Sequence, residues 1–335
     1  MDQVRDRSGD DAAATAEVAD RVAAMQARYA PRNRAIRRAL HTKTIAAAAG
    51  YLVVSDNVPA ELRAGLFARP ARHAAIVRFS SGQSWERPDW VPDVRGMAVR
   101  ISGLPVSAEG VQWQQDLLAV NGNIRFARDV AEFARLMPLM QSMVTVPLHV
   151  GRSIGVRQAS AFGRDFAGIV ARTLTCISGQ SFFCVAPIAV GGSAAKIALH
   201  PRQKGRRRSR LFAPDGLGES IDAWLEDTDL AWDLTLQRYR DGRTTPLDDL
   251  GVRWSERDSP PVRVASLVLS RRDRQTARLL RTEVERLAFS PWNALAEHRP
   301  IGCIQELRGR AYDVSVAGRL GGREGESRAD DRDSQ

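Results

Sequence analysis

The residues of greatest chemical interest lie near the carboxyl end, in a segment with helical spacing. Arg308, Tyr312 and Arg319 lie at positions i, i+4 and i+11, so a helix from Ile304 to Leu320 would place them on one face. A tyrosine phenol has a pKa of about 10 in water. Its use as an anionic ligand therefore requires a nearby positive charge, which Arg308 could supply. A half-buried tyrosine beside two solvated arginines explains the same pattern, so this segment alone does not identify a site.

Two further residues could take part in proton transfer and in polarising a substrate. His41 ends the segment RRALHTK just before a strand-like stretch, and a histidine in that place can project into a cavity. Asn121 closes the strand-like segment DLLAVN. A lone histidine is more often a surface or hydrogen-bonded core residue, and asparagine is common in turns. Neither residue identifies a site by itself.

The composition is that of a globular protein and argues against several classes of partner. The chain has 335 residues, 44% of them hydrophobic, which is enough for a sizeable core. Lysine plus arginine exceed aspartate plus glutamate by 49 − 39 = +10, but the charge is dispersed. Only Pro201–Arg210 forms a basic block, and such blocks are more often solvated loops than binding surfaces. We therefore expect no nucleic-acid partner.

Cysteine usage and hydropathy predict the compartment. Cys176, Cys184 and Cys303 are an odd number without CxxC spacing, which supports neither a disulfide framework nor a zinc site. No apolar run reaches the eighteen or so residues of a spanning helix, and the first residues, MDQVRDRSGDD, lack the apolar core of a signal peptide. We expect a soluble, cytoplasmic protein without membrane contact.

Short apolar segments that end in turn residues predict β-strands, too many and too short for a doubly wound sheet. They read IAAAAGYLVV, AAIVRFS, VRGMAVRI, DLLAVN, FFCVAPIAV, AKIALH, LAWDLTLQRY and VRVASLVL. Helical stretches are predicted between them at Val130–Met143, Val156–Leu174 and Thr276–Leu287. This order favours an α+β fold on an antiparallel sheet, which could close into a barrel.

The two ends of the chain differ from the middle. Ala12–Ala39 has apolar residues at helical spacing, which predicts an amphipathic arm over residues 1–37 that packs on a neighbouring subunit or domain. The Pro-punctuated segment FSPWNALAEHRPIG predicts a wrapping loop. The last helix should stop at Gly321 and Gly322, which leaves residues 321–335 as a disordered tail after the main domain of residues 38–320.

Seven segments together resemble the catalase family, in particular the short catalase-like haem peroxidases that retain the barrel and lack the C-terminal domain. They read RALHTK, IVRFSSG, DVRGMAVRI, DLLAVNGNIRFARD, PPVRVASLVLSRRD, VERLAFSPWN and RGRAYDVSVAGR. Their order is that of the family from about residue 38 to residue 319, and the separation of 37 residues between His41 and Arg78 also matches. Seven weak motifs in register argue against a chance match. The resemblance implies a catalase-like antiparallel β-barrel surrounded by helices.

The resemblance also implies a cofactor, a b-type haem with its iron held by Tyr312. Arg308 would then stabilise the Tyr312 phenolate. The arginines that would pair with the haem propionates are Arg38, Arg78 and Arg319. Charge-assisted arginine forks suit such carboxylates.

On the distal side, the resemblance implies a second set of residues. Ser80 would hydrogen-bond His41 and fix its tautomer, and Phe133 would lie over the distal face. Counting back from Arg128 and Asp129 without a gap places the family's distal asparagine at Val120, whereas a one-residue shift places it at Asn121. We predict that Asn121 faces the pocket.

The activity implied by the resemblance is a haem-dependent peroxidase acting on hydrogen peroxide or organic hydroperoxides. His41 would act as acid and base, Asn121 would polarise the peroxide, and Tyr312 would support a ferryl state that a small-molecule reductant returns to ferric iron. A homo-oligomer is also expected. Two alternatives remain open: a fatty-acid hydroperoxide isomerase of the allene oxide synthase kind, and a non-catalytic haem- or fatty-acid-binding protein.

Overall fold

The fold was taken from a computed structural model. It describes residues 8–104, 113–123, 127–136, 160, 163–165, 167–169, 176–203, 209–210 and 212–330. The strands in this part of the chain are β1 (Thr44–Val54), β2 (Arg72–Ser81), β3 (Arg95–Ser102), β4 (Gln115–Val120), β5 (Phe182–Cys184), β6 (Ile188–Val190), β7 (Ser193–Pro201), β8 (Leu230–Arg238) and β9 (Val262–Leu269). The helices of this part that bear on the site are α1 (Ser8–Asn33), α2 (Val130–Leu136), α5 (Gly216–Asp227), α6 (Arg274–Arg286) and α7 (Cys303–Asp330).

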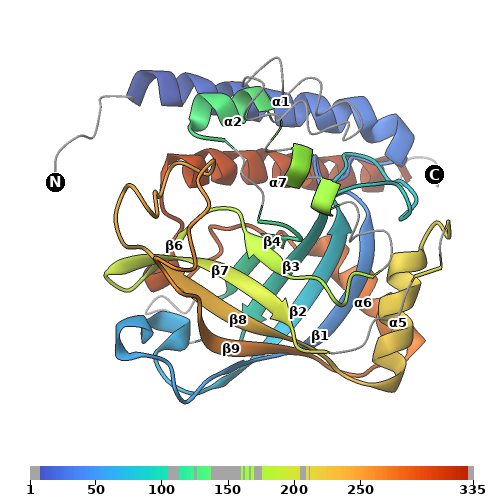
Figure 1. The fold of residues 1–335 in the computed structure, drawn as a ribbon. Coiled ribbons are helices and arrows are strands. Elements are labelled where there is room, and N and C mark those ends of the chain that lie inside the picture. The colour runs from blue at the N-terminus through green and yellow to red at the C-terminus, as the bar shows by residue number, and fades with distance from the viewer. Residues whose placement is uncertain are drawn as a thin grey trace.

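The strands form one antiparallel sheet that closes on itself. Their order is β5-β4-β3-β2-β1-β9-β8-β7-β6, and an additional pairing of β5 with β7 closes eight of them into a barrel, with β6 as a hairpin partner of β7 (Figure 1). The antiparallel sheet and its closure are confirmed. Closure matters because it removes the exposed strand edges that an open sheet would present.

Side chains along each strand alternate between the barrel core and the outer face of the sheet. In β8, Leu230, Trp232, Leu234 and Leu236 are fully buried inside the barrel, as the period of two requires. In β2, Val77 and Phe79 belong to the same core. The residues between such positions point outward, so strands with polar outward residues can present them to the covering helices.

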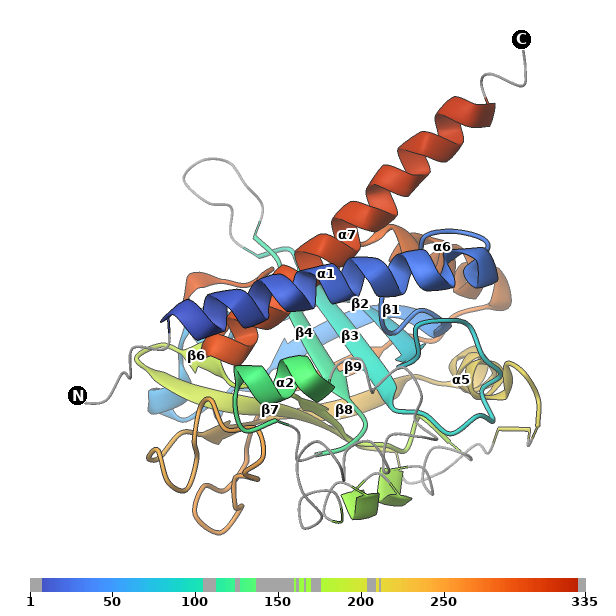
Figure 2. The same ribbon diagram turned by 90° about the horizontal axis from the view of Figure 1, so that it is seen from above.

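Helices α1, α2 and α7 lie together over one side of the barrel (Figures 1 and 2). The predicted apolar stripe of α1 is buried at Val18, Val22 and Met25, and α1 packs along both α7 and α2. The arm is thus helical as expected, although its helix ends at Asn33 rather than at residue 37. It packs on helices of its own chain.

Helix α6 and the loop after it lie where the sequence predicted them. Helix α6 begins after Asp273, whose side chain accepts a hydrogen bond from the Thr276 N–H, and this confirms the expected helix within two residues. The segment from Phe289 to Gly302 contains only the short 3₁₀ turn Ala296–His298, as its prolines predicted. The expected helix Val130–Met143 begins as α2, but its continuation and most of Val156–Leu174 lie outside the described residues.

Helix α7 is longer than the sequence predicted. It continues through Gly321 and Gly322 to Asp330 and extends away from the barrel (Figure 2). The expected stop at the two glycines is wrong, because glycine weakens a helix by roughly 1 kcal/mol but ends it only where the backbone turns left-handed. Residues 331–335 lie outside the described part. No helix among the described residues is long and apolar enough to cross a membrane.

Candidate active site

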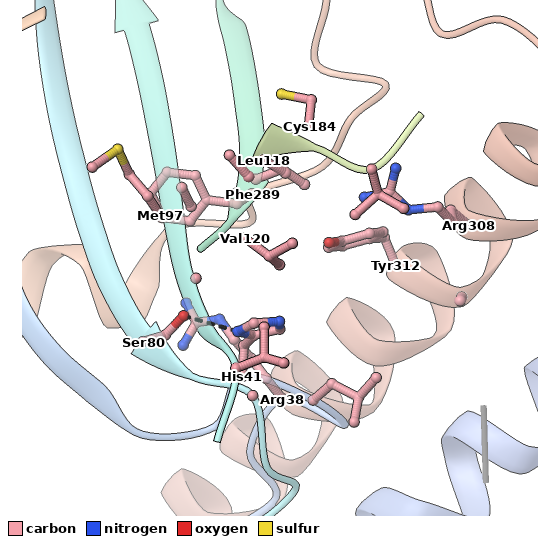
Figure 3. Close-up of a pocket in the computed structure, with 18 of the residues that line it drawn as sticks. Arg38, His41, Ser80, Met97, Leu118, Val120, Cys184, Phe289, Arg308 and Tyr312 are labelled. Atoms are coloured by element: carbon pink, nitrogen blue, oxygen red, sulfur yellow. Dashed lines mark hydrogen bonds between the residues drawn. The ribbon is translucent and has the colours of Figure 1, made fainter. Parts of the chain in front are cut away.

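A cavity of about 250 Å³ lies between the outer face of β2–β5 and helix α7 (Figure 3). Its barrel side includes Ser80 of β2, Leu118 and Val120 of β4, and Cys184 of β5. Tyr312 enters from the α7 side. The predicted residues that line this cavity are Arg38, His41, Arg78, Ser80, Phe133, Arg308, Tyr312 and Arg319. Residues from the first and the last hundred positions of the sequence, such as Arg38 and Arg319, therefore line the same cavity.

His41 is held in an unusual backbone conformation. Its φ is 56°, in the left-handed region that costs a residue with a Cβ roughly 1–2 kcal/mol. The His41 N–H donates to the Gly82 carbonyl at 3.2 Å, and Arg78 Nη2 donates to the His41 carbonyl at 2.8 Å. These bonds fix the backbone, so the ring is directed into the cavity by the chain on both sides.

The ring of His41 has one nitrogen engaged by a serine. His41 Nδ1 lies 3.1 Å from Ser80 Oγ, as Figure 3 shows. Gly96 on the neighbouring strand makes room for this pair, because a Cβ there would lie 2.7 Å from both His41 Nδ1 and Ser80 Oγ. With Nδ1 occupied, Nε2 is the ring nitrogen available for proton transfer.

The environment keeps the His41 imidazole neutral. Desolvation of the partly buried ring, followed by the positive charges of Arg78, Arg308 and Arg38, lowers the pKa of His41 from 6.5 to about 4. At neutral pH the ring therefore has an unprotonated nitrogen. A neutral, buried and oriented imidazole is able to act as a general base.

The three predicted arginines converge on an acid that the sequence analysis did not single out, Glu285. Arg38 forms an ion pair with Glu285, and Arg78 Nη2 lies 3.3 Å from Glu285 Oε1. Arg319 donates to the Glu285 carbonyl and, at 3.2 Å, to the Leu287 carbonyl. One carboxylate and the last carbonyls of α6 thus hold three cations together at the edge of the cavity.

Burial alone would raise the pKa of Glu285, but the charges of Arg78 and Arg38 outweigh this effect and lower it to about 2. The glutamate is therefore ionised at neutral pH. Three guanidinium charges against one carboxylate leave a net charge of +2, which suits a dianionic group in the cavity.

Tyr312 projects from α7 into the same cavity, with Arg308 one turn before it (Figure 3). Arg308 Nη1 donates to Gln305 Oε1 at 2.8 Å, which orients the guanidinium. The expected shared face of the helix is present, because Arg308, Tyr312 and Arg319 all line the cavity. The phenol and the imidazole of His41 therefore project into a common space.

Comparisons with known proteins bear on the fold. The family model described as Catalase matches residues 7–143. The fold of the chain is catalase-like. A fungal catalase solved at 1.9 Å superimposes with a TM-score of 0.68 and 18% identity, over 87% of this chain and 60% of that one. The β-barrel of this chain, with the helices around it, thus has the catalase fold.

Two further catalase structures give the same fold. A bacterial catalase matches with a TM-score of 0.62 and 20% identity, over 87% of this chain and 57% of that chain. Catalase A of Saccharomyces cerevisiae matches with a TM-score of 0.65 and 17% identity, over 87% and 62%. The chain therefore spans about three fifths of the length of these catalases. No curated protein matches it by sequence.

One residue that was predicted to face this cavity lies elsewhere. The side chain of Asn121 accepts a hydrogen bond from the Arg95 N–H at 2.7 Å and donates to Gln180 Oε1 at 2.6 Å. Val120 lines the cavity in its place. The prediction that Asn121 faces the pocket is wrong, because strand alternation sends consecutive side chains to different sides.

Three residues of the candidate site were not predicted from the sequence. Glu285 lies in VERLAFSPWN, a segment that resembles the catalase family, but no role was predicted for this glutamate. Gly96 lies in DVRGMAVRI, another such segment, and no role was predicted for it either. Lys196 of β7 lines the cavity and had no signal in the sequence. Among the described residues, no group of three or more His, Cys, Asp or Glu could hold a metal ion.

Proposed function

We propose that the chain binds a haem in this cavity and reduces peroxides. The single observation that supports this most strongly is the entry of a neutral, partly buried imidazole, His41, and a phenol, Tyr312, into one cavity. Peroxide reduction on haem uses an amino-acid side chain that binds the iron and a second side chain that accepts a proton from the peroxide. The catalase-like fold is consistent with that arrangement.

The residues of the cavity suit a haem. Its walls include apolar side chains, among them Leu118, Val120 and Phe133. Tyr312, with Arg308 beside it, would be the iron ligand, since an arginine stabilises a phenolate. The three arginines around Glu285 carry a net charge of +2, which matches the two propionates of a haem.

The chain's own residues would then move one proton. His41 Nε2 takes the proton from the hydroperoxide oxygen and returns it to the oxygen that leaves, while Ser80 at Nδ1 keeps the ring in place. A bound haem would supply the redox chemistry for the break of the O–O bond. A small-molecule reductant provides the two electrons that, with two protons, convert ROOH into ROH and water.

The distal wall favours an organic hydroperoxide over hydrogen peroxide. Efficient dismutation of hydrogen peroxide needs a polar partner beside the histidine, and the residue at that position is Val120. An apolar wall contributes little to holding a small polar peroxide, whereas it contacts the hydrocarbon part of an organic one. We therefore place organic hydroperoxides first among the substrates.

An absorption spectrum of the purified protein after reconstitution with hemin tests the cofactor and its ligand together. We expect a Soret band with the charge-transfer pattern of tyrosinate-bound ferric haem. The Tyr312→Phe variant should fail to retain haem, whereas Tyr239→Phe, outside the cavity lining, should retain it. A wild-type preparation that stays colourless, or equal haem retention by Tyr312→Phe, would refute the proposal.

Product analysis separates the proposed reduction from the alternatives. With a lipid hydroperoxide and a reductant, reduction gives the alcohol, whereas a fatty-acid hydroperoxide isomerase gives an epoxide. Full haem loading without turnover of any peroxide, with every donor, would favour a haem-binding protein. The reduction is supported by His41 as a base, which a storage protein does not require.

A further inference from the structure

Lys196 of β7 is a cationic residue of the cavity lining besides the four arginines, and the proposed peroxide chemistry does not use it. Ala195 and Ile197, on either side of it, point into the barrel core, so Lys196 points outward, where it lines the cavity. Its Nζ lies 4.8 Å from the centre of the Trp254 ring. This cation–π contact holds the ammonium group in place.

The ammonium group of Lys196 has no anionic partner in close contact. Within the described part of the chain, no hydrogen bond or ion pair involves its Nζ, and Asp249 acts on it only as a more distant charge. Burial, opposed by Asp249, lowers the pKa of Lys196 from 10.5 to about 8. A partly buried cation without a hydrogen-bonded anion is a costly arrangement that a bound carboxylate would relieve.

The position of Lys196 separates it from the arginine cluster. Val120 pairs with Phe183 of β5, and Phe183 pairs with Ala198 of β7, two residues from Lys196. From Arg78 on β2 to β7 the path crosses β3, β4 and β5, so it spans four interstrand spacings, or about 19 Å along the curved sheet. The two cationic positions therefore lie far apart along the cavity wall.

The wall between the two cationic positions is largely apolar. It includes Val120 of β4 and Phe183 of β5. Leu250 and Val252, from the loop that precedes Trp254, also line the cavity. A ligand that follows this wall from the His41 end would contact hydrocarbon side chains before it reaches Lys196. That pattern suits a molecule with an apolar body and an acidic end.

We propose that Lys196 binds the carboxylate of an organic hydroperoxide and thereby selects amphipathic acids, such as fatty-acid hydroperoxides, as substrates. The proposal rests on the proposed function, because it assigns the peroxide group to His41. The arginine cluster does not compete for this role, since the proposed function assigns it to the haem propionates and it lies at the opposite end of the wall. Lys196 is thus a specificity-determining residue and takes no part in the proton transfer.

The first test measures binding without turnover. Linoleate and methyl linoleate have the same chain, but only linoleate carries a charge, so their dissociation constants for the full-length, hemin-treated protein isolate the contribution of the carboxylate. We expect wild type to bind linoleate about tenfold more tightly than the ester, and Lys196→Met to lose that preference. Lys196→Arg should retain it. If wild type and Lys196→Met showed the same ratio of affinity for linoleate to affinity for methyl linoleate, the proposal would be overturned.

The second test uses turnover. The ratio of kcat/KM for linoleic acid hydroperoxide to that for its methyl ester should fall about tenfold in Lys196→Met. A merely structural role for Lys196 would lower both values together and leave the ratio unchanged, which would also overturn the proposal. If wild type consumes neither peroxide, the proposed function fails, and the binding test still decides the role of Lys196.

Discussion

Val120 and Asn121 are adjacent at the end of β4, yet their side chains lie in different surroundings. Val120 lines the cavity, whereas Asn121 accepts a hydrogen bond from the Arg95 N–H and donates to Gln180. The amide of Asn121 is thus used to join β4 to neighbouring segments. The wall beside His41 is left without a polar group at this position.

The Val120→Asn variant should gain activity toward hydrogen peroxide. An amide at this position could hydrogen-bond a small peroxide beside His41, and one such donor is worth roughly tenfold or more in rate. The rate of hydrogen peroxide consumption by the haem-loaded variant, monitored through the oxygen released, measures the effect. Val120→Leu is the matched control and should give no gain. The same low rate in Val120→Asn would show that the wall does not limit this activity.

The pH dependence of turnover should reveal the low pKa of His41. Because the pKa is about 4, the ring remains unprotonated as pH falls from 8 to about 5, and kcat/KM should decrease only near pH 4. A histidine at its ordinary pKa would already lose activity near pH 6.5. A pH profile with a midpoint near 6.5 would contradict the assignment of His41 as the buried base.

Removal of the His41 ring should separate catalysis from haem binding. His41→Ala should keep the haem spectrum and lower peroxide turnover by about 100-fold or more, which is typical for the loss of a general base. His73→Ala, a histidine that does not line the cavity, is the control and should retain turnover. Full activity in His41→Ala would exclude the proposed proton transfer.

Much of the fold was predictable because it depends on local patterns. Short apolar segments that end in turn residues identified the strands, and the stripe of Val18, Val22 and Met25 identified the first helix. The face of the last helix with Arg308 and Tyr312 followed from the period of 3.6 residues. These patterns are fixed within a few residues of one another, so the sequence is sufficient to predict them.

The features that were missed depend on register and on contacts across the chain. A shift of one residue decides whether Val120 or Asn121 faces the cavity, and no local pattern fixes that shift. Glu285 and Arg38 form an ion pair although 247 residues separate them. Lys196 reaches the cavity only because β5 pairs with β7 and closes the barrel. Such relationships appear once the strands are placed.

The Gly96→Ala variant should disturb the His41–Ser80 pair without loss of haem. The added Cβ would lie 2.7 Å from both His41 Nδ1 and Ser80 Oγ, so one or both side chains must move. We expect peroxide turnover to fall about tenfold or more, as for other losses of a group that orients a catalytic ring. Gly192→Ala, where a Cβ meets no atom, is the control. Unchanged turnover in Gly96→Ala would mean that the orientation of His41 does not depend on Ser80.

The Glu285→Gln variant should lose stability in a pH-dependent manner. The folded-state pKa of Glu285 is about 2 and its ordinary value is 4.5, so its charge stabilises the fold above pH 4.5, and this contribution is lost as pH falls toward 2. The difference corresponds to about 3 kcal/mol at neutral pH. Chemical denaturation of the haem-free protein should therefore give a lower free energy of unfolding for Glu285→Gln at pH 7 and a smaller difference at pH 3. Glu283→Gln, an exposed acid on the same helix, should differ little from wild type at either pH. A difference for Glu285→Gln that does not change with pH would show that the arginines do not depend on its charge.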